Sequence, residues 1–138
     1  MQNSATPLIP RAKLFGNPTR AQAQISTDGR WLSWLAPKDG VLNIWVAPSG
    51  DIGAARVVTN DSKRGIRFHG WMPNGTHVLY IQDEGGTEDW HVYAVEIATS
   101  AVRNLTPIAG VNAQLHGLSL DYPDEMIVGL NERDKAWH

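Results

Sequence analysis

The sequence contains no cysteine, which excludes disulfide bonds and thiolate metal sites and leaves the redox state of its compartment open. No apolar run approaches the roughly 18 residues of a membrane-spanning helix. Lysine and arginine form no cluster, and the net charge of −2 predicts neither a nucleic-acid partner nor attraction to a membrane. The N-terminus lacks the basic start and apolar centre of a signal peptide. We therefore expect a cytoplasmic protein, or a periplasmic one if a signal peptide has been removed.

Motifs of catalysis and cofactor binding are also missing. The nearest match to a Gly-x-Ser-x-Gly nucleophile elbow is 117–121, which lacks the closing glycine and a following helix, so Ser119 is interpreted as a strand residue. The five histidines show no metal-binding spacing. Gly85-Gly86 has no Gly-x-x-x-x-Gly-Lys pattern and is not a phosphate loop. We expect no catalytic residue, no metal and no cofactor in this chain.

Turn residues and large aromatic residues are plentiful instead. Six tryptophans, 13 glycines and eight prolines, with little helical periodicity, predict an all-β chain. The stretch 25–35 combines a strand end, the turn dipeptide Asp28-Gly29 and an apolar strand. A second copy follows at 71–81, where Asn74-Gly75 takes the place of the first dipeptide, 46 positions later. The chain is therefore built from a repeat.

Each repeat unit contains four expected strands. Ile44-Trp45-Val46 matches Val92-Tyr93-Ala94, and Val57-Val58-Thr59 matches Asn104-Leu105-Thr106. The expected strands are 21–25, 31–35, 41–47 and 56–59 in the first unit, 66–71, 77–81, 90–97 and 102–105 in the second, and 115–120 and 125–130 in a third that begins near 111.

Four short antiparallel strands in every 45 to 50 residues are typical of β-propeller blades. We expect an N-terminal arm over 1–20 and a partial propeller over 21–138. Its blades span about 21–60, about 66–107 and, for the start of a third, about 111–138. The chain thus supplies about two and a half blades of a larger ring, and its open strand edges predict self-association. A free-standing β-sandwich is the alternative, which the repeat disfavours.

Two further features bear on function. The loop 83–89 carries four carboxylates in seven residues, which suits a cation or a substrate amine, although the twelve-residue calcium-loop pattern is missing. The alternative interpretation is a solvated turn between two strands. Trp34 and Trp45 occupy strand positions and predict packing between blades rather than a carbohydrate platform.

Three stretches of the sequence resemble a known family. Residues 14–21 and 25–33 resemble the start of the N-terminal propeller of prolyl oligopeptidase-family serine peptidases. Residues 79–95 resemble the second blade of its bacterial acylaminoacyl-peptidase and dipeptidyl-aminopeptidase-like branch, including the acidic residues before Trp90-His91. The resemblance extends from about Pro10 to His138.

This resemblance implies a propeller of seven or eight blades over a C-terminal α/β-hydrolase domain. There, a Ser-Asp-His triad would cleave short peptides through an acyl-enzyme, and the propeller would restrict access by size. The triad would lie beyond residue 138, so the expected partners are that hydrolase domain and peptide substrates. Propeller glutamates bind the substrate N-terminus in the dipeptidyl-peptidase branch, and Glu84 and Glu88 are the candidates here. A non-catalytic propeller that scaffolds protein partners is the alternative.

Overall fold

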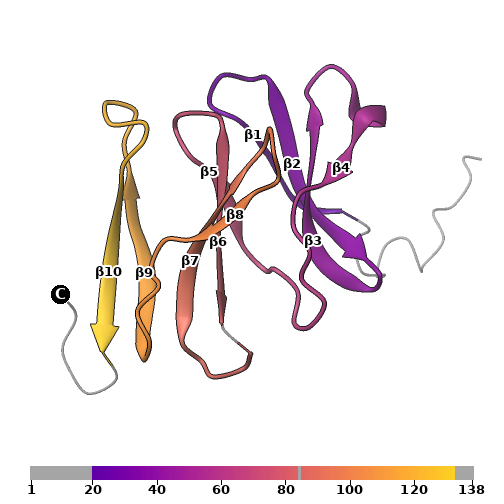
Figure 1. The fold of residues 1–138 in the computed structure, drawn as a ribbon. Helices are drawn as coiled ribbons and strands as arrows, with labels where there is room; N and C mark the ends of the chain where they lie inside the picture. Colours follow the sequence, from indigo (N-terminus) through magenta and orange to yellow (C-terminus); the bar gives the residue numbers. More distant parts are fainter. Residues whose placement is uncertain (1–19, 84, 133–138) are drawn as a thin grey trace, which may run out of the picture.

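A computed structural model of the chain describes residues 20–83 and 85–132. Within these residues the regular structure consists of strands and one short 3-10 turn, η1 (Ile52–Ala54), which confirms the all-β prediction (Figure 1). No helix in the described part could span a membrane. The strands are β1 (Ala21–Ile25), β2 (Trp31–Lys38), β3 (Val41–Pro48), β4 (Arg56–Val57), β5 (His69–Trp71), β6 (His77–Asp83), β7 (Trp90–Glu96), β8 (Val102–Asn104), β9 (Val111–Leu118) and β10 (Met126–Glu132).

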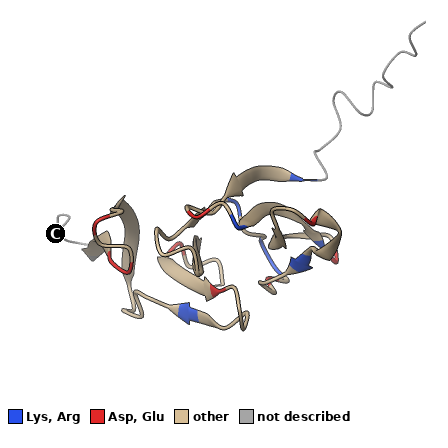
Figure 2. Cartoon of the chain, turned by 90° about the horizontal axis from the view of Figure 1, so that it is seen from above, with Lys and Arg blue, Asp and Glu red and all other residues tan. Residues whose placement is uncertain are grey.

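The strands form three antiparallel sheets that follow one another along the chain. The first sheet has the order β1-β2-β3-β4, the second has the order β5-β6-β7-β8, and the third pairs β9 with β10. The sheets stand side by side like the blades of a fan, and charges of both signs are scattered over them (Figure 2). Each complete sheet is a meander of neighbouring strands, as in a propeller blade.

The turns between the first two strands of each complete sheet repeat in atomic detail. The side chains of Asp28 and Asn74 each accept a hydrogen bond from the backbone N–H two residues later, at 3.1 and 3.0 Å. Gly29 and Gly75 follow them with φ angles of +74° and +71°, which glycine adopts without steric cost. Asp28 also accepts a 2.7 Å bond from the Ser26 hydroxyl, and these bonds hold the pKa of its carboxyl below the usual range.

The main core lies between the first and second sheets. Alternation along β7 turns Tyr93 and Val95 toward the first sheet and Val92 and Ala94 toward the third sheet. β7 therefore contributes to both interfaces between sheets. The buried members of the first core are Leu35, Ile44, Val46, Val58, Ile66, Trp71, Val78, Tyr80, Val95 and Ile97.

Trp34 and Trp45 face each other across β2 and β3 on the other side of the first sheet, away from the second. Trp34 is buried and Trp45 is half-buried, with its ring N–H donating to the Ala36 carbonyl at 3.2 Å. The corresponding pair in the second sheet is Tyr80 and Tyr93, which stack at 5.2 Å on the face turned toward the first sheet. The two aromatic pairs thus lie on corresponding faces of their sheets. In the second sheet this face packs against the first sheet.

Two strand starts differ by more than one residue from the sequence-based expectation. The strand expected at 66–71 begins only at His69, because the backbone N–H of Ile66 donates to the Leu42 carbonyl of the first sheet at 2.8 Å. Residues 66–68 therefore cross between sheets. The first strand of the third unit begins at Val111 rather than at 115, because Val111 already pairs with Glu132 of β10.

The interpretation of Ser119 as a strand residue is wrong. β9 ends at Leu118, and Ser119 lies in the turn that leads to β10. Its carbonyl accepts a hydrogen bond from the Tyr122 N–H at 3.3 Å, and its hydroxyl accepts one from the Asp121 N–H at 3.2 Å. Serine satisfies the backbone of a turn in this way, which draws the residue out of the strand.

Candidate functional site

The acidic loop joins β6 to β7 at the end of the second sheet opposite to the Asn74 turn (Figure 1). Asp83 at its start is buried, and its carboxylate forms an ion pair with Arg64 at 3.1 Å. Glu88 is exposed and has a φ of +63°. Glu84 lies outside the described residues. The structure thus turns Asp83 inward and leaves Glu88 available to solvent.

A fully buried asparagine fixes the segment that carries Arg64. The Asn43 side-chain oxygen accepts hydrogen bonds from the Thr59 hydroxyl at 2.8 Å and the Asp61 N–H at 2.7 Å. Its amide donates to the carbonyls of Asp61, at 2.9 Å, and Val41, at 3.1 Å. Because the buried amide has partners for both polar atoms, the crossing between the first and second sheets is held in one position.

Arg64 reaches the acidic loop through a close contact with glycine. A Cβ atom at Gly86 would lie 3.0 Å from Nη2 of Arg64, and Gly86 has a φ of +91°. Glycine therefore permits both the turn and the approach of the guanidinium. A cavity of about 280 Å³ lies here, lined by Asn60, Asp61, Ser62, Lys63, Arg64, Gln82, Asp83, Gly85, Gly86 and Tyr93.

The metal-binding interpretation of the acidic loop finds no support among the described residues. Among the described residues, no group of three metal-ligating side chains comes together. The carboxylate of Asp83 is already paired with Arg64, so little of its charge remains for a cation.

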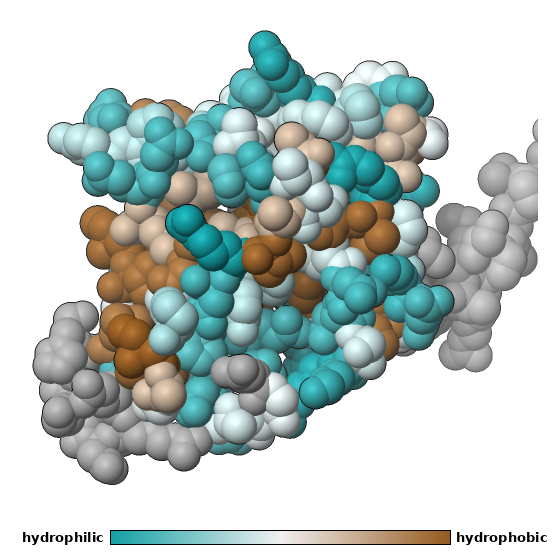
Figure 3. Space-filling model, in the orientation of Figure 1, coloured by the Kyte–Doolittle hydropathy of each residue, from teal (hydrophilic) through white to brown (hydrophobic). Residues whose placement is uncertain are grey.

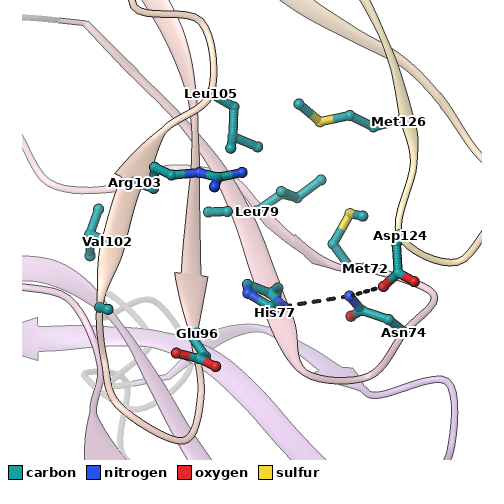
Figure 4. Close-up of a pocket in the computed structure, with 12 residues that line it drawn as sticks. Met72, Asn74, His77, Leu79, Glu96, Val102, Arg103, Leu105, Asp124 and Met126 are labelled. Carbon is teal, nitrogen blue, oxygen red and sulfur yellow. Dashed lines mark hydrogen bonds between the residues drawn. The ribbon is translucent and has the colours of Figure 1, made fainter.

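A larger cavity, of about 530 Å³, lies between the second sheet and the β9–β10 turn (Figure 4). Asn74 donates a hydrogen bond to the Asp124 carboxylate across it at 3.0 Å. Apolar side chains and polar ones both contribute to its lining. The lining residues are Met72, Asn74, His77, Leu79, Ala94, Glu96, Ala101, Val102, Arg103, Leu105, Asp124 and Met126. Sequence reasoning missed this cavity, because it forms between sheets from residues far apart along the chain.

The repeat explains why this larger cavity is open. Leu105 corresponds to Val58, which is 3% exposed and packs in one cluster with Val95 and Ile97 of the second sheet. Leu105 is half-buried instead, and the third sheet has no described strand in the position of β7. The cavity therefore corresponds to a filled region of the first interface.

Two four-stranded meanders and a strand pair, packed face to face with repeating turns and repeating aromatic pairs, define a segment of a β-propeller. Solved structures support this class. A putative TolB from Agrobacterium tumefaciens aligns with a TM-score of 0.62 and 18% identity, over 88% of this chain and 42% of that one. Puromycin hydrolase, as an S511A mutant, aligns with a TM-score of 0.53 and 20% identity, over 82% of this chain and 20% of that one.

Sequence comparison gives the family. Dipeptidyl aminopeptidase BIII of Pseudoxanthomonas mexicana is 48% identical over 135 residues, which are 98% of this chain and 20% of the relative. Dipeptidyl peptidase family member 6 of Caenorhabditis elegans is 23% identical over 97% of this chain and 19% of the relative. No protein-family model matches the chain. The chain spans about one fifth of these curated relatives, and its similarity to them supports a propeller segment of a prolyl oligopeptidase-family peptidase.

Proposed function

We propose that this segment is part of a serine peptidase that removes dipeptides from the N-termini of short peptides. The observation that carries the proposal is the 48% identity with dipeptidyl aminopeptidase BIII over 98% of the chain. In this proposal a C-terminal α/β-hydrolase domain holds the catalytic triad, and the present segment contributes no catalytic residue. The name of that relative favours dipeptidyl-aminopeptidase activity over the acylaminoacyl-peptidase activity of the same branch.

The proposed role of the segment is to restrict access by size. Hydrogen bonds between the first two sheets support rigid packing of one blade against the next. The Gln24 amide in β1 donates to the His69 carbonyl in β5 at 2.8 Å, and the Arg56 guanidinium donates to the Ser100 hydroxyl at 3.0 Å. Together with the apolar core, these bonds resist separation of the blades, so a large substrate would gain no entry between them.

The coding sequence downstream of His138 provides the first test. A Gly-x-Ser-x-Gly motif within the following several hundred residues is the expected result. The absence of this motif would refute the proposal and favour the non-catalytic scaffold.

The complete protein should then be assayed on chromogenic dipeptidyl, aminoacyl and N-acylaminoacyl substrates. We expect the dipeptidyl substrate to be preferred, whereas preference for the N-acylaminoacyl substrate would assign the other activity of the branch.

We also propose a cytoplasmic location, which a signal peptide encoded upstream of Met1 would contradict.

Glu84 and Glu88 are proposed to bind the α-ammonium group of the substrate. Exposure of Glu88 in the β6–β7 loop supports this role, because a carboxylate must reach the ligand to pair with it. In the complete peptidase, Glu84→Gln or Glu88→Gln should raise KM roughly tenfold with little change in kcat, as expected for lost binding in both ground and transition states. Glu125→Gln, in an exposed turn at the other end of the sheets, is the matched control. If both variants behave like the control, the two glutamates have no such role.

A further inference from the structure

A third cavity, of about 290 Å³, shares Arg64, Gln82 and Asp83 with the cavity of about 280 Å³ but is not lined by Gly85 or Gly86. Two large aromatic side chains in its wall are unusually open to solvent: Phe68 is 53% exposed and Trp90 is 38% exposed. An exposed pair of this kind in one concave site is typical of a binding surface. We call this cavity the aromatic cleft, and its lining residues are Arg64, Gly65, Arg67, Phe68, Ile81, Gln82, Asp83 and Trp90.

The crossing between the sheets and the start of β7 bring the two aromatic residues into one cavity. His69 at the start of β5 is fully buried against the first sheet, whereas its neighbour Phe68, at the end of the crossing, is exposed. Trp90 lies two residues before Val92 and shares its face, toward the third sheet. The backbone N–H of Trp90 already donates to the Asn112 side chain of β9 at 2.9 Å. The third sheet therefore contacts the backbone of Trp90, while the indole ring of Trp90 remains partly exposed.

The charge of the aromatic cleft favours an anion. Two guanidinium groups and one carboxylate line it, and the carboxylate of Asp83 pairs with Arg64. Arg67 forms no ion pair with any described residue, and its side chain is exposed. Its backbone is held in place, because the Arg67 carbonyl accepts a 2.6 Å bond from the Gln22 amide. One positive charge is thus in excess, on a group whose planar fork matches a carboxylate.

We propose that the aromatic cleft binds the C-terminal residue of a short peptide. The carboxylate pairs with Arg67, and an apolar side chain packs against Phe68 and Trp90. The volume of about 290 Å³ is at the lower end for ligand sites, so it accommodates one residue rather than a longer segment. The inference does not rest on the proposed peptidase activity.

Titration of the full chain with N-acetylphenylalanine, followed by calorimetry or by NMR shifts, tests the proposal. N-acetylphenylalaninamide is the matched neutral probe. We expect the acid to bind at least about tenfold more tightly than the amide. Arg67→Gln should abolish this difference, and Phe68→Ala should weaken binding of both probes. Arg103→Gln, which removes an exposed arginine on β8 outside the cleft, should change neither.

Equal binding of the acid and the amide would identify an apolar pocket without a carboxylate site and would overturn the proposal. An unchanged preference for the acid in Arg67→Gln would also overturn it. The same holds if no binding is seen up to about 20 mM probe, because a carboxylate paired with arginine and packed on aromatic rings should bind with a dissociation constant below that concentration. Circular dichroism of each variant establishes that the fold is intact. A coding sequence without a hydrolase segment would refute the peptidase function and leave this binding result unaffected.

Discussion

The Ser33 hydroxyl oxygen in β2 lies 2.9 Å from Nε2 of His69 in β5, and both side chains are fully buried between the first and second sheets. Most of this interface is apolar, so the pair forms a specific polar link between two blades. Burial lowers the pKa of His69 to about 4, because the charged imidazolium loses its hydration there. The residue is therefore neutral in the folded protein at physiological pH.

This histidine should make the protein acid-sensitive. The unfolded chain binds a proton at its His69 near pH 6.5, whereas the folded chain does so only near pH 4. Stability is therefore fully present above pH 6.5 and is lost as the pH falls from 6.5 toward 4, by up to about 3 kcal/mol. Urea unfolding at several pH values should show a shallower dependence for His69→Gln than for the wild type. His116→Gln, at an exposed histidine, should match the wild type, and equal slopes for all three proteins would contradict the prediction.

Thr106 should stabilise the second sheet through its hydroxyl. That hydroxyl accepts a hydrogen bond from the backbone N–H of Val92 at 3.0 Å. In the first sheet the Thr59 hydroxyl likewise accepts one from the N–H of Ile44 at 2.9 Å. Thr106→Val keeps the shape and leaves a buried N–H without its partner, which should cost about 1–3 kcal/mol in unfolding free energy. Thr27→Val, at an exposed position, should cost much less in the same chemical denaturation experiment. Similar losses at both positions would refute a specific role for the buried hydroxyl.

Gly75 should tolerate alanine less well than Gly29, although the two glycines have nearly the same φ. A Cβ at Gly75 would lie 3.0 Å from Oδ2 of Asp28, whereas a Cβ at Gly29 meets nothing within 4 Å. The carboxylate cannot easily withdraw, because the Ser26 hydroxyl holds it. Both variants carry the left-handed backbone penalty of about 1–2 kcal/mol, and Gly75→Ala should lose more. Thermal melts of the two variants measure the difference, and a lower melting temperature for Gly29→Ala would contradict the prediction.

The ion pair of Arg64 and Asp83 should respond asymmetrically to substitution. The Asp83 side chain is 2% exposed and that of Arg64 is 56% exposed. Arg64→Ala leaves a buried carboxylate without its ion-pair partner and should cost about 2–3 kcal/mol, whereas Asp83→Asn leaves a solvated guanidinium and should cost less. Denaturant unfolding at neutral pH gives both values. The reverse order would mean that Arg64 contributes little to holding the loop.

The outer edge of β10 should promote self-association. It pairs with no strand in the described part of the chain, and apolar side chains gather over the third sheet (Figure 3). Ile127 on this strand is 68% exposed. Light scattering of the chain should show concentration-dependent association that Ile127→Lys reduces, because an edge lysine opposes strand pairing. Ile52→Lys, an equally apolar exposed position in η1, is the control. A stable monomer at high concentration would refute this prediction.

Local chemistry is what made most of the fold predictable from sequence. The turns at Asp28 and Asn74 and the strand alternation of β2, β3, β6 and β7 depend on neighbouring residues, so their repetition indicated blades. The predicted burial of Trp34 follows from the same alternation. Ser119 lies in a turn and not in a strand, because its hydroxyl accepts a hydrogen bond from the nearby Asp121 N–H, an interaction that competes with strand pairing.

The candidate site was predictable only in part. The acidic loop was visible as a cluster of charges, but the sequence could not indicate that Asp83 turns inward to Arg64. The aromatic cleft left no sequence signal, since only the folded chain brings Phe68, in the crossing between sheets, into one cavity with Trp90 at the start of β7.

The repeating turns, the strand pattern and, through similarity, the family can be read from the sequence, because short stretches of residues carry them. Three features become visible only in the folded chain: the return of Ile66 to the first sheet, the contact of Ser33 with His69, and the aromatic cleft. Each of them depends on the packing of one sheet against another, and such packing sums many weak contacts between distant residues.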